Sequence, residues 1–280
     1  MEELTVSDGT DTAILRKVAK RKNQDVDQPI WSLTTDVPRE HSKRLIQLLE
    51  AAAQAISFSG GGKLEFWIEN ISEETRKTPI NAGYEPFRDL LRMKRSLPGT
   101  PSNLLTRSFN KNDYEDILRI NNSAFDWHPD QAGMTKESLL VTQNESWYLE
   151  DGFRVLEVEK IVTGFCWTKI HSELKSIKGE IYVIALDPER QGEGLGRELV
   201  LSGMEWLSAR KIKEIFLYVE ADNHRAVKMY KSMGFDVEYT NQCFQRVIRN
   251  SPKSQELESE TDPQNLQESN SQIREIPDRN

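Results

Sequence analysis

The most constraining feature of the sequence is the segment 179–196, GEIYVIALDPERQGEGLG, in which an apolar run turns into a glycine-rich loop. Residues 181–186 are apolar and partly β-branched and end at Asp187-Pro188, a pattern that predicts a covered strand rather than a helix. Gly192, Gly194 and Gly196 then stand at alternate positions directly before a helical pattern. Such glycines let backbone N–H groups close on an anion, and the helix N-terminus behind them favours negative charge. The segment therefore predicts a strand–loop–helix unit that binds a phosphate-bearing ligand.

The glycine loop by itself fits more than one kind of structure. Its spacing does not match the dinucleotide pattern G-x-G-x-x-G, and it lacks the Lys-Ser/Thr pair of nucleotide P-loops. A tight turn without any ligand is an alternative for the loop alone. Residues 215–235 supply a further strand, Asn223, a short helix that carries Tyr230, and the pair Gly234-Phe235. This second block favours a ligand site over a simple turn.

Together the two blocks resemble the core of the GNAT-type N-acetyltransferases, whose loop pattern Q/R-x-x-G-x-G/A is matched by Gln191, Gly194 and Gly196. Several further segments, in the same order, are similar to the mycothiol synthase family within that superfamily: 121–125, 127–129, 164–171, 179–183 and 217–223. The resemblance covers about residues 105–245. It implies an enzyme that uses acetyl-CoA to acetylate the cysteinyl amine of the desacetylmycothiol precursor, Cys-GlcN-Ins, a small thiol-sugar acceptor.

The resemblance also implies roles for particular residues. Glu180 matches the general base that takes the amine proton, and Tyr230 matches the hydroxyl that protonates the coenzyme thiolate. Lys169, Glu180 and Tyr218 match residues that bind the acceptor. The residues matched to acetyl-CoA binding are Ile184, Ala185, Leu186, Gln191, Gly192, Glu193, Gly194, Leu195, Gly196, Arg197, Asn223, His224, Arg225, Ala226, Val227 and Lys228.

Each of these roles stands beside a structural alternative. Glu180 also fits a solvated glutamate at a strand end, and Tyr230 a half-buried helical tyrosine. Lys169 fits an exposed strand lysine, and Tyr218 a tyrosine packed on a sheet. For the whole chain, the alternatives are a GNAT enzyme for another small amine or a protein N-terminus, and a non-catalytic acyl-CoA-binding module.

Two acceptor contacts of the family have no counterpart, and one of them is a substrate carboxylate that the family's full N-terminal unit supplies. The aspartate that the family carries near Trp147-Tyr148 falls on Leu149, although Glu150 and Asp151 follow directly. The acceptor contacts at this point therefore differ in detail from the family pattern.

The sequence also contains an internal repeat. Residues 63–84 resemble residues 214–235, and both copies carry a Glu followed by a Gly fourteen residues later. The earlier copy has side chains, Ser42, Arg44 and Ile46, where the later copy has its three loop glycines. We therefore predict an α/β (α+β) fold of two GNAT-like mixed-sheet units, of which the first is shortened and lacks the chemistry.

This repeat gives the predicted domains. Residues 1–97 form a shortened, degenerate GNAT-like domain, 98–104 a linker, 105–250 the catalytic GNAT domain and 251–280 a disordered acidic tail. The chemistry is thus predicted to lie wholly in the second unit.

Local patterns predict several further elements. Residues 12–21 are expected to form a short helix, and residues 112–124 a longer one with a buried face. Residues 153–158 and 161–171 are expected to form a hairpin around Glu159-Lys160.

Composition excludes several classes of protein. The 280 residues carry a formal charge of −8, of which −4 (seven acids, three bases) belongs to residues 251–280, so no basic surface for nucleic acid is expected. Cys166 and Cys243 fit packed free thiols rather than a disulfide framework or a metal cluster. There is neither a run of about twenty apolar residues nor a signal peptide, so we expect a cytoplasmic protein without membrane contact. We also expect a monomer without bound metal.

Overall fold

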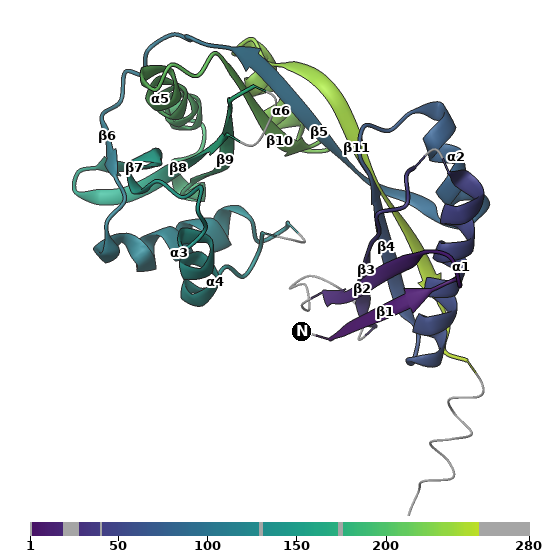
Figure 1. Ribbon diagram of the computed structural model, residues 1–280. Helices are drawn as coiled ribbons and strands as arrows, with labels where there is room; N and C mark the ends of the chain where they lie inside the picture. Colours follow the sequence, from purple (N-terminus) through teal and green to yellow (C-terminus); the bar gives the residue numbers. More distant parts are fainter. Residues whose placement is uncertain (1, 19–27, 40, 129–130, 173–175, 252–280) are drawn as a thin grey trace, which may run out of the picture.

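The computed structural model describes residues 2–18, 28–39, 41–128, 131–172 and 176–251 (Figure 1). The tail prediction for residues 252–280 lies outside the described residues. Eleven strands form one mixed sheet in the order β1-β2-β3-β4-β11-β5-β10-β9-β8-β7-β6. None of the helices in these ranges is long and apolar enough to cross a membrane.

We call the elements up to β5 the first half and those from β6 onward the second half. The first half contains β1 (Glu3–Ser7), β2 (Thr12–Val18), β3 (Ile30–Thr34), α1 (Ser42–Phe58), β4 (Gly62–Ile68), α2 (Glu73–Asn81) and β5 (Glu85–Ser96). The second half contains β6 (Thr106–Ser108), α3 (Tyr114–Ala124), α4 (Lys136–Gln143), β7 (Phe153–Val158), β8 (Ile161–His171), β9 (Lys178–Leu186), α5 (Leu195–Ala209), β10 (Glu214–Glu220), α6 (His224–Ser232) and β11 (Asp236–Ile248).

The helix predicted over residues 12–21 is wrong for residues 12–18, which form strand β2, and residues 19–21 lie outside the described ranges. Ala13 and Leu15 are buried while Thr12 and Arg16 are exposed, and this alternation has the period of a strand. β2 pairs with β1 on one side and β3 on the other, so its backbone groups are satisfied by the sheet.

The predicted helix near residues 112–124 and the predicted hairpin are confirmed. α3 follows a single 3-10 turn and buries Ile117 and Ile120. β7 and β8 pair antiparallel, and Glu159 and Lys160 between them have φ of 54° and 66°, as a tight turn requires.

The last strand of each half crosses into the other half. β5 lies between β11 and β10, while β11 lies between β4 and β5, so both run along the join between the halves (Figure 1). The side chains follow the backbone. Met93 of β5 belongs to the core of the second half with Leu217, and Phe244 of β11 belongs to the core of the first half with Phe66. Each half is therefore completed by a strand of the other.

The two halves repeat the same order of elements. β3, α1, β4, α2 and β5 correspond to β9, α5, β10, α6 and β11, and both β3–β4 and β9–β10 are parallel pairs. In the second half, α3 and α5 pack on opposite faces of β8, because Phe165 and Trp167 join the core under α3 whereas Cys166 joins the core under α5. The predicted class, a mixed α/β fold with two similar units, is confirmed.

Candidate active site

The two central strands of the second half separate after a short paired stretch. β9 and β10 pair only at Gly179–Ile215, Glu180–Phe216 and Ile181–Leu217. Beyond these pairs, β9 continues to Leu186 along β8, and β10 continues along β5. A register shift opposite Trp167 and Thr168 adds twist to β9 where it leaves β10. The backbone of residues 182–186 consequently has one edge without a strand neighbour.

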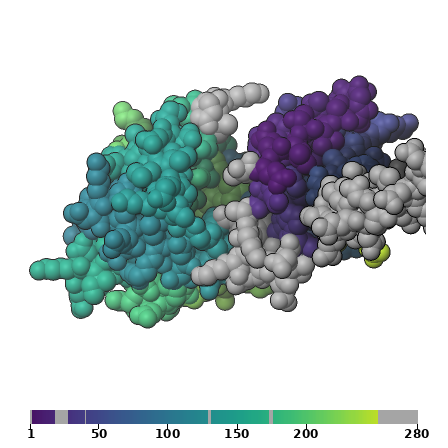
Figure 2. Space-filling model, turned by 90° about the horizontal axis from the view of Figure 1, so that it is seen from below, coloured from purple at the N-terminus to yellow at the C-terminus, as the bar shows by residue number. Residues whose placement is uncertain are grey.

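A cavity of about 1000 Å³ occupies this gap. Its wall comes from β9, the glycine loop, β10 and α6, and from Phe125, Trp127 and His128 after α3. The first half adds Trp67, Arg88 and Leu90 from β4 and β5. Seen from below, the two halves stand on either side of a recess (Figure 2).

The glycine loop has the backbone that the sequence predicts. Gly192 and Gly194 have φ of 100° and 82°, a conformation that other residues rarely adopt. Gly194 is the N-cap of α5 and offers no capping side chain, so the first N–H groups of the helix are left for a ligand. Gly192, Gly194 and Gly196 all line the cavity. The loop therefore has the geometry of an anion site at a helix N-terminus.

Arginines surround this loop. Arg190 contacts Glu193 at 2.8 Å, Arg225 Nη1 donates to Gln191 Oε1 at 2.8 Å, and Arg197 Nη1 donates to Ser232 Oγ at 3.0 Å. Arg197 and Arg225 line the cavity. Their positive charge, next to the start of α5, suits phosphate groups.

The cavity brings together most of the residues predicted to bind acetyl-CoA. Those that line it are Ile184, Ala185, Leu186, Gln191, Gly192, Gly194, Gly196, Arg197, Asn223, Arg225 and Ala226. The remaining five predicted residues are not among its lining: Glu193, Leu195, His224, Val227 and Lys228. Asn223 has a structural task as well, because its Oδ1 accepts the Ala226 N–H at 3.2 Å and caps α6.

Glu180 lies on β9 at the closed end of the gap and is only 7% exposed. Its Oε2 is 2.7 Å from His171 Nε2, and the His171 ring packs on Phe216. The solvated glutamate considered from the sequence is therefore not what the structure shows. His171 received no role from the sequence, although β8–β9 pairing places it two residues beyond Lys169, the partner of Glu180.

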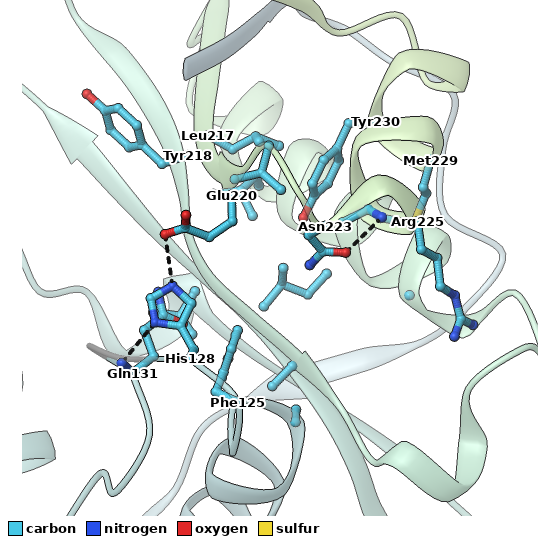
Figure 3. Close-up of a pocket in the computed structure, with 18 of the residues that line it drawn as sticks. Phe125, His128, Gln131, Leu217, Tyr218, Glu220, Asn223, Arg225, Met229 and Tyr230 are labelled. Carbon is cyan, nitrogen blue, oxygen red and sulfur yellow. Dashed lines mark hydrogen bonds and ion pairs between the residues drawn. The ribbon is translucent and has the colours of Figure 1, made fainter. Parts of the chain in front are cut away.

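Tyr230 lies on α6 and lines the same cavity, with its hydroxyl directed toward Asn223 and the cavity interior (Figure 3). Its ring is 5% exposed, and this burial raises the pKa of the hydroxyl above its ordinary value. The hydroxyl is therefore protonated at neutral pH and able to donate a proton.

The two residues predicted only for acceptor binding lie in different surroundings. Tyr218 lines the cavity, is 39% exposed, and has its hydroxyl 3.4 Å from that of Tyr239. Lys169 is not among the lining residues. Its ammonium lies over the rings of Trp147 and Tyr182, at 4.5 and 5.7 Å from their centroids, and of these two rings Tyr182 reaches the cavity.

A charged cluster in the cavity wall was not assigned from the sequence. Glu220, at the end of β10, is 6% exposed, and its Oε1 accepts from Arg88 Nη2 at 2.7 Å. The same Oε1 lies 3.4 Å from His128 Nε2 (Figure 3). Burial by itself raises the pKa of Glu220, but the hydrogen bonds with His128 and Arg88 outweigh it and hold the pKa below its usual range. Glu220 is one of the residues that mark the internal repeat, but no feature of the sequence indicates that it pairs with Arg88.

His128 holds this cluster to the loop after α3. Its Nδ1 accepts the backbone N–H of Gln131 at 3.2 Å, so in the neutral ring the proton is on Nε2, which faces Glu220. Within the described ranges, no three His, Cys, Asp or Glu side chains are grouped to hold a metal ion.

Residues 114–235 match the acetyltransferase (GNAT) family. The chain is 36% identical over 201 residues to a mycothiol acetyltransferase of Acidimicrobium ferrooxidans, covering 69% of this chain and 65% of that protein. It is 35% identical over 219 residues to a mycothiol acetyltransferase of Amycolatopsis mediterranei, covering 72% of this chain and 70% of that protein. The matches thus span about two thirds of the length of these relatives.

Among solved structures, a GCN5-related N-acetyltransferase from Sphaerobacter thermophilus superposes with a TM-score of 0.66 at 18% identity. The superposition covers 85% of this chain and 78% of that protein. At this identity the likeness concerns the fold, and it confirms the GNAT-like architecture expected from the sequence.

Proposed function

Because the chain belongs to the GNAT acetyltransferases and, within them, to the mycothiol acetyltransferase family, we propose that it acetylates the cysteinyl amine of Cys-GlcN-Ins with acetyl-CoA and so forms mycothiol. One observation carries this proposal: the same cavity joins an anion-binding loop, the buried carboxylate of Glu180 and the buried hydroxyl of Tyr230. All three come from one chain, so we expect a monomer to be active.

The residues present fit acetyl-CoA. The N–H groups at the start of α5 and the side chains of Arg197 and Arg225 would hold its phosphates. The free edge of residues 184–186 would hydrogen-bond the pantetheine arm and polarise the acetyl carbonyl. When bound, acetyl-CoA supplies the acetyl group as a thioester.

Glu180 is the proposed general base. The attacking nitrogen must be neutral, and a free α-amine has a pKa of about 7.7 to 8.0, so a carboxylate acting through water suffices near neutral pH. His171, 2.7 Å away, fixes the orientation of this carboxylate. Glu180 takes the amine proton as the C–N bond forms.

Tyr230 is the proposed general acid. As the C–N bond forms, the C–S bond of the thioester breaks and the electron pair stays on sulfur. The hydroxyl of Tyr230 gives its proton to this thiolate, and its raised pKa keeps it protonated until then. One proton thus leaves the amine toward Glu180 and another reaches the sulfur from Tyr230.

The test is to incubate the protein with acetyl-CoA and Cys-GlcN-Ins and to identify the product by mass spectrometry. Glu180→Gln should lower kcat about a hundredfold, the usual scale of general-base catalysis, with the affinity for acetyl-CoA unchanged. Glu214→Gln is the matched control, because Glu214 lies on the neighbouring strand and pairs with Lys178 outside the cavity. Its rate should equal that of the wild type.

Assays with other amine acceptors distinguish a mycothiol acetyltransferase from a GNAT enzyme for another amine and from a binding module. A small amine or a peptide N-terminus acetylated faster than Cys-GlcN-Ins would remove the mycothiol assignment and leave the enzyme class in place. Binding of acetyl-CoA without release of coenzyme A in the presence of any acceptor would instead indicate a binding module.

A further inference from the structure

The cavity has a second polar region, built across the two halves. Arg88 of β5 and Glu220 of β10 form its ion pair, and Arg88 also lies over the ring of Trp67 on β4, 5.2 Å from its centroid. The side chains of Arg88 and Glu220 are only 12% and 7% exposed, yet both line the cavity. The first half thus supplies part of the wall of a site whose proposed catalytic residues all belong to the second.

The position of this pair relative to the catalytic residues is set by the strands. Glu220 lies three residues beyond Leu217, the last residue of β10 that pairs with β9. At the rise of an extended strand, this places it about 10 Å from the point where the strands part. Glu180 and Glu220 are on the same face of the sheet, because Glu180 pairs with Phe216 and side chains alternate along β10. A molecule with its amine at the gap would therefore reach Arg88 and Glu220 with its far end.

The chemistry of the pair selects the kind of group that it can bind. Arg88 supplies N–H donors and Glu220 supplies carboxylate acceptors, and their charges cancel. A phosphate or carboxylate ligand would meet the negative charge of Glu220, whereas a neutral ring with several hydroxyls can donate to Glu220 and accept from Arg88.

We propose that Arg88 and Glu220 form a subsite for the inositol ring of the acceptor, so that the first half of the chain contributes to acceptor specificity. This inference rests on the proposed function and goes beyond it by assigning the far end of the acceptor to residues of both halves. Trp67 and His128 are positioning residues, because one underlies the guanidinium and the other holds the carboxylate.

The experiment measures kcat/KM with three acceptors: Cys-GlcN-Ins, cysteinyl-glucosamine without the inositol, and cysteinamide without either ring. In the wild type, removal of the inositol should lower kcat/KM by about tenfold or more, as expected when hydrogen bonds to charged groups are lost. In Arg88→Met the same removal should change kcat/KM by less than about threefold, and the loss relative to the wild type should be larger with Cys-GlcN-Ins than with cysteinamide.

Two further variants separate binding from structure. Arg16→Met is the matched control, since Arg16 lies on β2 and makes an exposed ion pair with Glu3; its acceptor profile should equal that of the wild type. Arg88→Lys keeps the positive charge beside Glu220 but loses the planar guanidinium with its several N–H donors. It should show the same selective loss, in part, and it replaces Arg88→Met if that variant does not fold.

An equal effect of inositol removal in the wild type and in the Arg88 variants would overturn the subsite. An equal loss with all three acceptors would also overturn it and indicate a structural role for Arg88. Calorimetry with glucosaminyl-inositol alone, which has no cysteine to acetylate, distinguishes failure of the subsite from failure of the proposed function. Binding to the wild type that weakens in Arg88→Met supports the subsite even if Cys-GlcN-Ins is not acetylated, and no binding to the wild type overturns it.

Discussion

The first and second halves of this protein share an order of elements, but only the second half opens between its parallel strands. In the second half, β9 extends five residues beyond its last pair with β10, from Ile181 to Leu186. In the first half, β3 extends one residue beyond its last pair with β4, from Leu33 to Thr34. The short β3 leaves no free strand edge on which a pantetheine arm could lie.

The starts of the two equivalent helices differ in the same sense. No side chain caps the first N–H groups of either helix, but α5 follows Gly192 and Gly194, whereas the first turn of α1 carries Arg44, whose Nε donates to Asp11 in the β1–β2 turn at 2.8 Å. The second half thus combines a glycine-rich helix start with a strand that extends well beyond its partner, whereas α1 and β3 of the first half have neither feature.

The largest expected effect comes from separating the halves. Residues 105–250 produced alone lack β5, so β10 and β11 lose their common neighbour and Met93 leaves the core. We expect this fragment to be insoluble, and we expect co-expression with residues 1–104 to restore a soluble 1:1 complex. Soluble, separately folded fragments with cooperative melting would contradict the strand exchange.

The exchange of β5 and β11 can also be tested by truncating one buried side chain on each of these strands. Phe244→Ala and Met93→Ala should each cost about 2 to 5 kcal/mol of unfolding free energy, because both residues are fully buried. Hydrogen exchange should locate the damage across the join, with Phe244→Ala raising exchange in β4 and α1, and Met93→Ala raising it in β10 and α5. Each variant is the control for the other, and damage confined to the half that contains the mutation would refute the exchange.

The number of acetyl-CoA molecules bound per chain should show that only the second half binds the coenzyme. Calorimetry with acetyl-CoA should give one site per chain, and Gly194→Glu should weaken binding at least a hundredfold through added charge and backbone strain. Gly60→Glu is the matched control, because Gly60 has a similar φ of 95° and lies after α1, away from the cavity. Two sites per chain would show that the first half also binds coenzyme.

Tyr230→Phe should lower kcat by about tenfold to a hundredfold, since water must then protonate the thiolate. Burial raises the pKa of Tyr230, so the wild-type hydroxyl stays protonated throughout the range up to about pH 10, the ordinary tyrosine value. The wild-type rate should therefore not decline between pH 8 and about pH 10 through this group. Tyr84→Phe is the control, a buried tyrosine of the first half that donates to the Leu49 carbonyl; a matching loss there would remove the acid role.

The smallest effect is expected for Arg44→Ala in the first half. The hydrogen bond from Arg44 lowers the pKa of Asp11, so the folded state keeps this carboxylate charged to lower pH than the unfolded chain does. The stabilisation is present above the ordinary Asp pKa of about 3.9 and is lost as pH falls through the lower folded value. The variant should melt slightly below the wild type at pH 7 and equally at about pH 2, and it should still bind one coenzyme. A second bound coenzyme would mean that Arg44 alone blocks the first half.

Much of the site on the second half was readable from local pattern. Gly192 and Gly194 have the positive φ that their spacing predicts, and Tyr230 lies on the helix that follows Asn223. These features depend on residues close in sequence, where propensity and capping act. The error over residues 12–18 has the same origin, because the local pattern predicts a helix whereas pairing with two neighbouring strands decides the conformation.

By itself, the sequence determined the strand–loop–helix unit, the repeat and the family, because each is recognised from short motifs and their order along the chain. Only the tertiary structure decided that β5 and β11 exchange places, that His171 supports Glu180, and that Arg88 meets Glu220 across 132 residues of chain. The physical reason is that strand pairing joins distant segments through backbone hydrogen bonds, which are the same for every sequence. Which side chains then share a cavity follows from the register of the whole sheet rather than from any local motif.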